Sequence, residues 1–222
     1  MTILEELIRY ARDCIDDRYV SVDEDYISCQ KHKWACQRFL RDLDRSKAGT
    51  SDFPYIWNEG EAQKIVDWFS LLRHSKGDLA GQPILLTSWQ KFDLCQIYGW
   101  RHRDTGRKRF KQSFTEVGRK NAKSQMEAGV ALYEISTQST RNEEIYECYT
   151  AGTKRDQSKI IFNEAKLMLR GSPLRTKFKL TRDLIEHIKT GSFIKALCKE
   201  DGQKGDGTNP AVLILDECNR RV

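Results

Sequence analysis

The first 80 residues carry apolar side chains at helical spacing in three segments. Residues 3–16 and 30–44 repeat apolar positions every three or four residues, and a third such segment starts after Asn58 and ends before residues 75–77. Asn58 followed by Glu61 is typical of a helix start. The pattern predicts a helical N-terminal region, residues 1–80, whose aromatic side chains lie in its core. The apolar positions of the first two segments include Ile3, Leu4, Leu7, Ile8, Ala11, Ile15, Trp34, Phe39, Leu40 and Leu43.

From about residue 82 the pattern changes to short strands that alternate with helices. This alternation is typical of an α/β domain with a mostly parallel sheet flanked by helices, and we assign residues 81–222 to it. Residues 171–191 are poorly patterned. The predicted strands are 110–117, 145–151, 193–198 and 211–215, and the predicted helices are 124–135 and 155–169.

Composition narrows the class of protein. The 222 residues include 32% charged and 39% hydrophobic side chains, and no apolar run approaches the roughly 18 residues of a membrane span. Residues 1–20 read as an amphipathic helix rather than a secretory signal, so a cytoplasmic protein is expected. The seven cysteines are odd in number and never spaced C-x-x-C, which favours reduced thiols over a zinc site or disulfide framework.

Basic residues concentrate between residues 101 and 111, within a net charge of +6. Two interpretations fit this cluster. It is either a solvated β-hairpin that turns at residues 104–106 or a hairpin that faces DNA. Binding that weakens steeply with ionic strength would indicate DNA phosphate contacts.

Residues 117–124 carry the most specific chemistry, because they follow a predicted strand and open a predicted helix. A phosphate-binding loop at such a position wraps backbone N–H groups around phosphates. Its lysine, here Lys123, reaches the β and γ oxygens, and its hydroxyl residue, here Ser124, binds Mg²⁺. The match is incomplete, because Val117 and Ala122 stand at positions where such loops usually have glycine.

The apolar run 211–215 ends in two acids, Asp216 and Glu217. The run predicts a strand covered on both faces, with both acids at the carboxyl end, where open α/β sheets bind ligands. Asp216 would hold Mg²⁺ through water, and Glu217 would polarise the water that attacks the γ-phosphate. Without the loop upstream, the same residues would read as a strand that runs into an acidic, solvated turn.

Trp89 and Gln90 precede the loop by about 30 residues. A glutamine amide can both donate to and accept from the adenine edge while an aromatic ring covers its face. The alternative is structural, with Ser88 as a helix N-cap and Trp89 in the core.

Together these features resemble the ATPase domain of the large terminase subunit of tailed bacteriophages, the motor that packs double-stranded DNA into capsids. The resemblance covers most of the chain. It rests on eight segments in order: 36–43, 54–55, 74–77, 89–90, 98–100, 119–124, 151–157 and 207–210. It implies partners as well: double-stranded DNA, a portal protein, a small terminase subunit and further copies of the chain in a ring.

The resemblance also implies roles for individual residues. Glu217 activates water, Ser124 and Asp216 serve Mg²⁺, and Trp89 with Gln90 lies near the adenine of ATP. Arg119 reaches the γ-phosphate as an arginine finger does; a surface arginine on a basic loop is the alternative. The ATP phosphates are bound by Gly118, Arg119, Lys120, Asn121, Ala122, Lys123 and Ser124.

Two departures from the family pattern affect these expectations. A methyl group at Ala122 opposes a positive φ or crowds a phosphate. The sequence stops at Val222, shortly after the acidic strand, so we expect an incomplete sheet, a fragment that lacks the family's nuclease domain, and no nuclease activity. Two other functions compete: another phosphate-loop DNA motor such as a helicase, and a non-catalytic DNA-binding or assembly protein with a decayed nucleotide loop.

Overall fold

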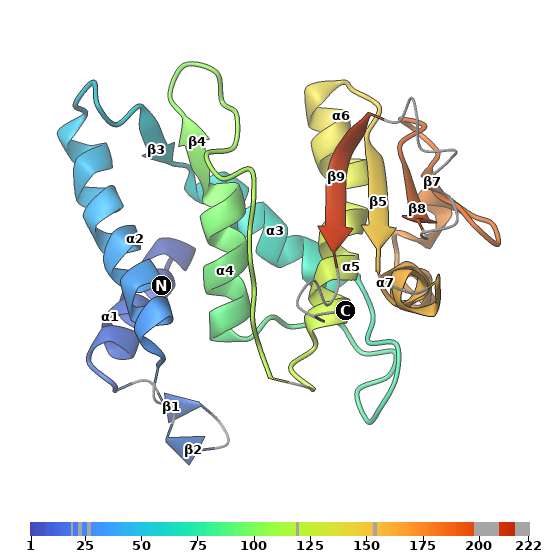
Figure 1. Ribbon diagram of the computed structural model, residues 1–222, viewed down its shortest axis with the longest axis horizontal. Helices are drawn as coiled ribbons and strands as arrows, with labels where there is room; N and C mark the ends of the chain where they lie inside the picture. Colours follow the sequence, from blue (N-terminus) through green and yellow to red (C-terminus); the bar gives the residue numbers. More distant parts are fainter. Residues whose placement is uncertain are drawn as a thin grey trace. The chain divides into compact units, whose positions relative to one another are not determined.

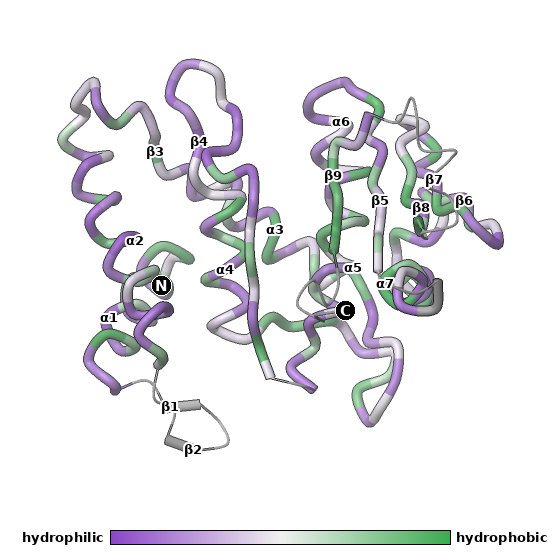
Figure 2. The backbone as a smooth tube through the Cα atoms, viewed as in Figure 1, coloured by the Kyte–Doolittle hydropathy of each residue, from purple (hydrophilic) through white to green (hydrophobic). Residues whose placement is uncertain are grey.

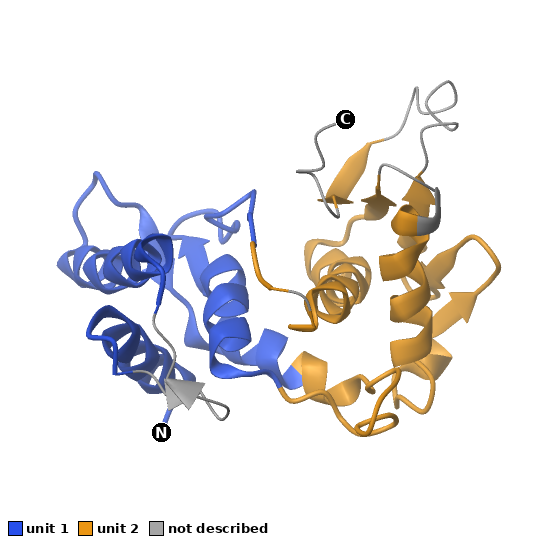
Figure 3. Ribbon diagram, turned by 60° about the horizontal axis from the view of Figure 1, so that its bottom comes forward, with its two compact units in different colours: residues 1–67, 86–115 blue, residues 68–85, 116–222 orange. Residues whose placement is uncertain are grey.

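The structure is a computed structural model that describes residues 1–18, 20–21, 24–25, 28–118, 120–152, 155–197 and 209–215. The chain divides into two compact units (Figure 3). Unit 1 comprises residues 1–67 and 86–115, and unit 2 comprises residues 68–85 and 116–222. The domain boundary at residue 80 remains a prediction. In the described part of the chain, no helix combines the length and apolar character that a membrane crossing requires.

Unit 1 is built mainly of helices, as the N-terminal pattern predicts (Figure 1). They are α1 (Ile3–Ile15), α2 (Gln30–Ala48), the first turns of α3 (Glu59–Leu71) and α4 (Ser88–Gly99). Thr2 and Glu5 form a capping box at the start of α1, and Asn58 Oδ1 accepts the N–H of Glu61 at the start of α3. Two short antiparallel pairs complete the unit: β1 (Val20–Ser21) with β2 (Glu24–Asp25), and β3 (Tyr55–Trp57) with β4 (Trp100–His102).

Aromatic side chains fill much of the core of unit 1. Phe39 of α2 meets Trp57, Phe92 and Trp100 edge to face, with ring centroids 5.4, 5.6 and 6.4 Å away. Such pairs add stability beyond the area they bury. Trp34 is the exception to the predicted aromatic core, because it is 59% exposed. Trp34 lies on the solvent side of α2. The spacing of apolar residues did not separate it from the buried positions of this helix.

Unit 2 is an α/β structure with a five-stranded sheet in the order β6-β7-β8-β5-β9 (Figure 1). Helices α5 and α7 pack against each other and against this sheet. The strands are β5 (Glu147–Ala151), β6 (Phe178–Leu180), β7 (Ile185–His187), β8 (Phe193–Leu197) and β9 (Pro210–Leu215). The helices are α5 (Lys123–Tyr133), the π-helix η1 (Glu134–Gln138), α6 (Ser139–Asn142), α7 (Arg155–Met168) and the 3-10 helix η2 (Arg175–Lys177).

The α/β class is confirmed, but the prediction of a mostly parallel sheet is wrong. Strand β5 is parallel to β8 and β9, whereas β6, β7 and β8 pair antiparallel. The antiparallel hairpin β6–β7 falls in residues 171–191, which show no clear pattern of apolar residues. The sheet is therefore mixed, with its parallel part at β8, β5 and β9.

Two further strand predictions need correction. Residues 110–117 form no strand; Phe114 is 72% exposed, and the residues around it are mostly polar. Strand β9 forms as predicted, but it is not covered on both faces, because Leu213 and Leu215 are 51% and 53% exposed. It is hydrophobic along most of its length (Figure 2) and lies at the edge of the sheet, paired with β5. With a single neighbouring strand, its apolar side chains are only partly covered.

Candidate functional site

The loop that precedes α5 has an unusual backbone. Lys120 and Ala122 both have a positive φ, of 69° and 55°, and α5 begins at Lys123 directly afterwards. A side chain disfavours this left-handed conformation, so the loop holds two residues in a conformation better suited to glycine. Asn121 Nδ2 donates to the carbonyl oxygen of Gly118 at 3.1 Å. This bond spans the tip of the loop.

The loop lies where a ligand site is expected in an open α/β sheet. Helix α5 contacts β9 and runs antiparallel to β5 and β9, so its N-terminus lies at the carboxyl ends of these strands (Figure 1). The predicted acids Asp216 and Glu217 directly follow β9 in the sequence. Both acids and Arg119 lie outside the described residues.

A segment from α3 to α4 contacts the first turn of α5. Gln125, the residue after Ser124, lies 3.3 Å from His74 Nδ1 through its Nε2. The backbone of His74 is held in turn by bonds to Gln82 and Gly81, and Ser75 Oγ donates to Glu164 Oε1 of α7 at 2.6 Å. In the sequence, residues 74–77 are part of the family resemblance, and residues 75–77 also mark the end of the third predicted helix. The contact of His74 with Gln125 gives this motif a local role, which is to support the start of α5.

The predicted adenine-binding pair, Trp89 and Gln90, lies on α4 in unit 1. Gln90 is buried, and its Oε1 accepts the N–H of Thr87 at 3.0 Å. The glutamine therefore caps the start of α4, with Thr87 rather than Ser88 as the N-cap. Trp89 is half-buried. Their role toward adenine stays a prediction.

The basic cluster 101–111 forms the predicted hairpin, but two of its arginines are not available to DNA. Arg101 is buried and its guanidinium bonds to Glu61 at 3.0 Å. Arg109 bonds to buried Asp42 at 2.8 Å and stacks over the rings of Phe53, Tyr55, Trp100 and Phe110. The exposed basic residues in this stretch are Arg103, Arg107 and Lys111.

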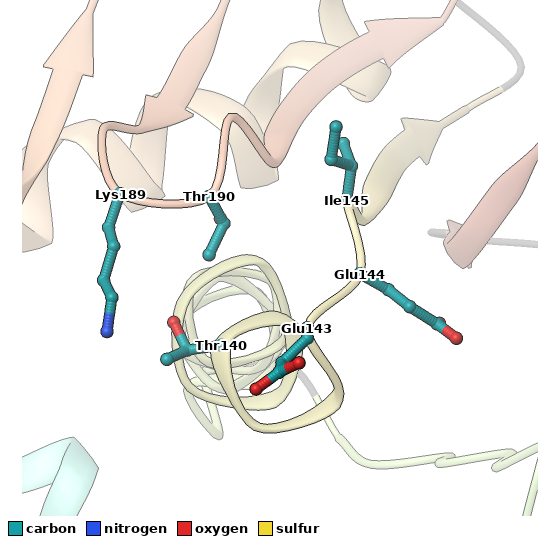
Figure 4. A pocket seen from close by; sticks show the side chains of 6 residues that line it. All are labelled: Thr140, Glu143, Glu144, Ile145, Lys189 and Thr190. Carbon is teal, nitrogen blue, oxygen red and sulfur yellow. The ribbon is translucent and has the colours of Figure 1, made fainter.

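A surface hollow of about 290 Å³ lies elsewhere in unit 2, between the turn after α6 and the turn that joins β7 to β8. Figure 4 shows Thr140, Glu143, Lys189 and Thr190 around it, with Glu144 directed away from Lys189. The hollow contains none of the sequence-predicted site residues. The predicted phosphate loop, residues 117–124, is therefore supported by its backbone conformation and its place at the sheet, and the hollow adds nothing to it.

Comparisons with known proteins support the family and the fold of this chain. Residues 88–221, more than half of the chain, match the family model "Terminase large subunit, ATPase domain". No curated protein matches the sequence. Among solved structures, the crystal structure of the HK97 bacteriophage large terminase matches with a TM-score of 0.56 and 22% identity. The match covers 70% of this chain and 31% of that terminase.

At this identity the structural match supports the fold alone. The family model covers the phosphate loop, α5, the sheet and the acidic residues after β9. This chain therefore belongs to the family of terminase large subunit ATPase domains.

Proposed function

We propose that this chain binds ATP with the loop 117–124 and hydrolyses it as the motor domain of a viral DNA-packaging terminase. The observation that carries the proposal is the loop itself. Two left-handed residues, Lys120 and Ala122, deliver the chain to the N-terminus of α5 at the carboxyl ends of parallel strands.

The chemistry of this loop suits a phosphate group. The first N–H groups of a helix lack intrahelical partners, and the helix dipole places partial positive charge there. The loop residues 118 and 120–122 are exposed, so a ligand can reach these N–H groups. Lys123 adds an ammonium group and Ser124 a hydroxyl group that suits Mg²⁺. Mg²⁺, when bound, would neutralise charge on the β and γ phosphates.

The remaining roles follow from the family pattern. We propose that Asp216 holds Mg²⁺, Glu217 activates the attacking water and Arg119 stabilises charge on the γ-phosphate. Trp89 and Gln90 are proposed to contact adenine. Because Gln90 Oε1 already caps α4, its Nε2 is the group proposed to face the base.

Coupling to DNA is the wider part of the proposal. The chain corresponds to only 31% of the matched HK97 terminase, so the activity of a whole terminase is a proposal for this chain. We propose that it acts in the host cytoplasm in a ring of its own copies, with a portal protein, a small terminase subunit and double-stranded DNA.

Nucleotide binding is the first property to test. We would measure the thermal shift caused by Mg²⁺ and a non-hydrolysable ATP analogue in the wild type, Lys123→Ala and Lys179→Ala. Lys179 is an exposed lysine on β6, at the opposite edge of the sheet from β9. Ligand at about 100 times its dissociation constant stabilises a protein by roughly 2.7 kcal/mol, which is about 5 °C or more at this size. The shift should vanish only in Lys123→Ala; no shift in the wild type would contradict the proposal.

Turnover and DNA coupling need a second experiment. Glu217→Gln should keep the thermal shift but abolish phosphate release. Double-stranded DNA should stimulate hydrolysis by the wild type without strand separation, and strand separation would instead indicate a helicase. If neither Lys123→Ala nor Glu217→Gln changes DNA binding, and the wild type hydrolyses no ATP, the chain is instead an assembly protein with a decayed nucleotide loop.

A further inference from the structure

Three side chains of metal-binding type meet between α1 and α2 in unit 1. They are Cys14 in the last turn of α1, and His32 and Cys36 on α2. Their ligand atoms all lie within 4.8 Å of one another. Both cysteines are fully buried and the histidine is half-buried. None of these three residues belongs to the proposed nucleotide site.

The helices explain why the cluster forms. His32 and Cys36 are four residues apart on α2, so they share one face of that helix. Helix α1 packs against α2 and brings Cys14 to the same face. The sequence contains no C-x-x-C pattern and therefore favours reduced thiols over a zinc site. That pattern identifies only ligands that lie close together in the sequence. Here the two thiols are separated by a helix-to-helix connection.

Neighbouring polar and aromatic side chains contact the cluster. Tyr10 Oη lies 3.0 Å from His32 Nε2, and the imidazole packs edge to face against Phe92, so the ring is held in place. Ser28 Oγ is buried and interacts with the Cys14 thiol, so a further polar group lies beside the cluster. A metal-bound water at this position can hydrogen-bond to that hydroxyl.

The donor set selects the type of metal. Two thiolates and an imidazole suit a borderline-soft ion that favours tetrahedral coordination, which describes Zn²⁺. Zn–S distances of about 2.3 Å and Zn–N distances of about 2.0 Å place tetrahedral ligand atoms roughly 3.5 to 3.8 Å apart. The ligand atoms of the cluster all lie within 4.8 Å of one another, so they need to approach by at most about 1.3 Å to reach that arrangement.

We propose that Cys14, His32 and Cys36 bind a Zn²⁺ ion, with a water molecule next to Ser28 as the fourth ligand. Both thiols lose their protons to solvent on binding, which makes the affinity dependent on pH. The ion joins the end of α1 to the first turns of α2 and so stabilises unit 1. The proposal is independent of the nucleotide site.

Metal content and cobalt substitution test this site directly. The protein is purified under reducing conditions, stripped with a chelator and titrated with Zn²⁺ or Co²⁺. The expected result is about one ion per chain, and a cobalt spectrum with thiolate charge-transfer bands and tetrahedral visible bands. This measurement uses the wild-type chain, so it does not depend on whether a variant folds. A wild type without the cobalt spectrum, or with no stoichiometric zinc, overturns the proposal.

Variants then assign the ligands. Cys14→Ser and Cys36→Ser should lose stoichiometric zinc, whereas Cys95→Ser, which alters another buried thiol of unit 1, should keep it. Tyr10→Phe should keep the cobalt spectrum and weaken zinc binding by roughly 10- to 100-fold, the usual effect of removing a group that hydrogen-bonds to a metal ligand. Zinc retention in Cys14→Ser overturns the assignment. If the wild type contains a Cys14–Cys36 disulfide and still binds no zinc after that disulfide is reduced, the proposed site is wrong.

Discussion

Gly129 of α5 faces the ring of Phe69 of α3 so closely that a Cβ at position 129 would lie 2.3 Å from Phe69 Cε1. The neighbouring Trp68 donates its indole N–H to the carbonyl oxygen of Gly129 at 3.2 Å. Gly129 therefore lets α3 and α5 pack closely within unit 2. Helix α5 is the helix that begins at the predicted phosphate loop.

Gly129→Ala should destabilise the protein, although alanine normally favours a helix. Overpacking of this kind costs about 1 to 3 kcal/mol, more than the roughly 0.5 to 1 kcal/mol that alanine contributes to a helix interior. Urea denaturation would measure the change in unfolding free energy. Gly60→Ala, where the nearest atom is 3.5 Å away, is the control and should be neutral or stabilising. Equal stability of Gly129→Ala and wild type would contradict the close contact.

Ala122→Gly should stabilise the protein and leave nucleotide binding intact or stronger. Ala122 has φ 55° and ψ 26°, a left-handed conformation that glycine adopts freely. We expect a gain of about 1 kcal/mol in the free energy of unfolding. Ala128→Gly, within α5, is a control for the same change in a helix and should instead lose about 1 kcal/mol or more, because it also removes a buried methyl group. The dissociation constant of an ATP analogue checks the second part, and clearly weaker binding would refute our interpretation of the loop.

Local features of the sequence predicted much of the fold. The start of α3 at Asn58 and the start of α5 after the loop depend on residues within a few positions, and the structure confirms both. Long-range features were not predictable in this way. The burial of Arg101 and Arg109 depends on Glu61 and Asp42, which lie 40 and 67 residues away. A charge pattern read along the chain cannot detect such partners.

Strand predictions failed for related physical reasons. The hairpin β6–β7 consists of two strands of only three residues each, which is too short for an alternating pattern to be recognised. Residues 110–117 include the strand-favouring Phe110, Phe114 and Val117, but a strand also needs a neighbour for its backbone groups. Gln90 was interpreted from its chemistry alone, as a residue that binds adenine. In the structure its side-chain oxygen accepts the N–H of Thr87 and caps α4, a contact that the residue type does not predict.

Arg101→Ala should destabilise unit 1 rather than act mainly on DNA binding. The guanidinium lies between Glu61 Oε2 and the carbonyl oxygen of Tyr98, each 3.0 Å away, in a buried site. Removing one member of a buried ion pair costs about 3 kcal/mol or more. Arg103→Ala, on the same hairpin but exposed, should stay within about 0.5 kcal/mol of wild type. Denaturation midpoints compare the two; an unchanged midpoint for Arg101→Ala would show that the pair contributes little.

His187 should make unit 2 less stable in mild acid. Burial lowers the pKa of His187 below its usual 6.5, and Lys177 and Lys189 lower the pKa further. Between 6.5 and the lowered pKa, the unfolded chain binds more protons than the folded chain, so the free energy of unfolding falls as the pH drops through this window. His187→Gln should flatten this part of the stability curve, measured by urea denaturation from pH 7.5 to 5. Identical slopes in the wild type and His187→Gln would exclude His187 as the titrating group.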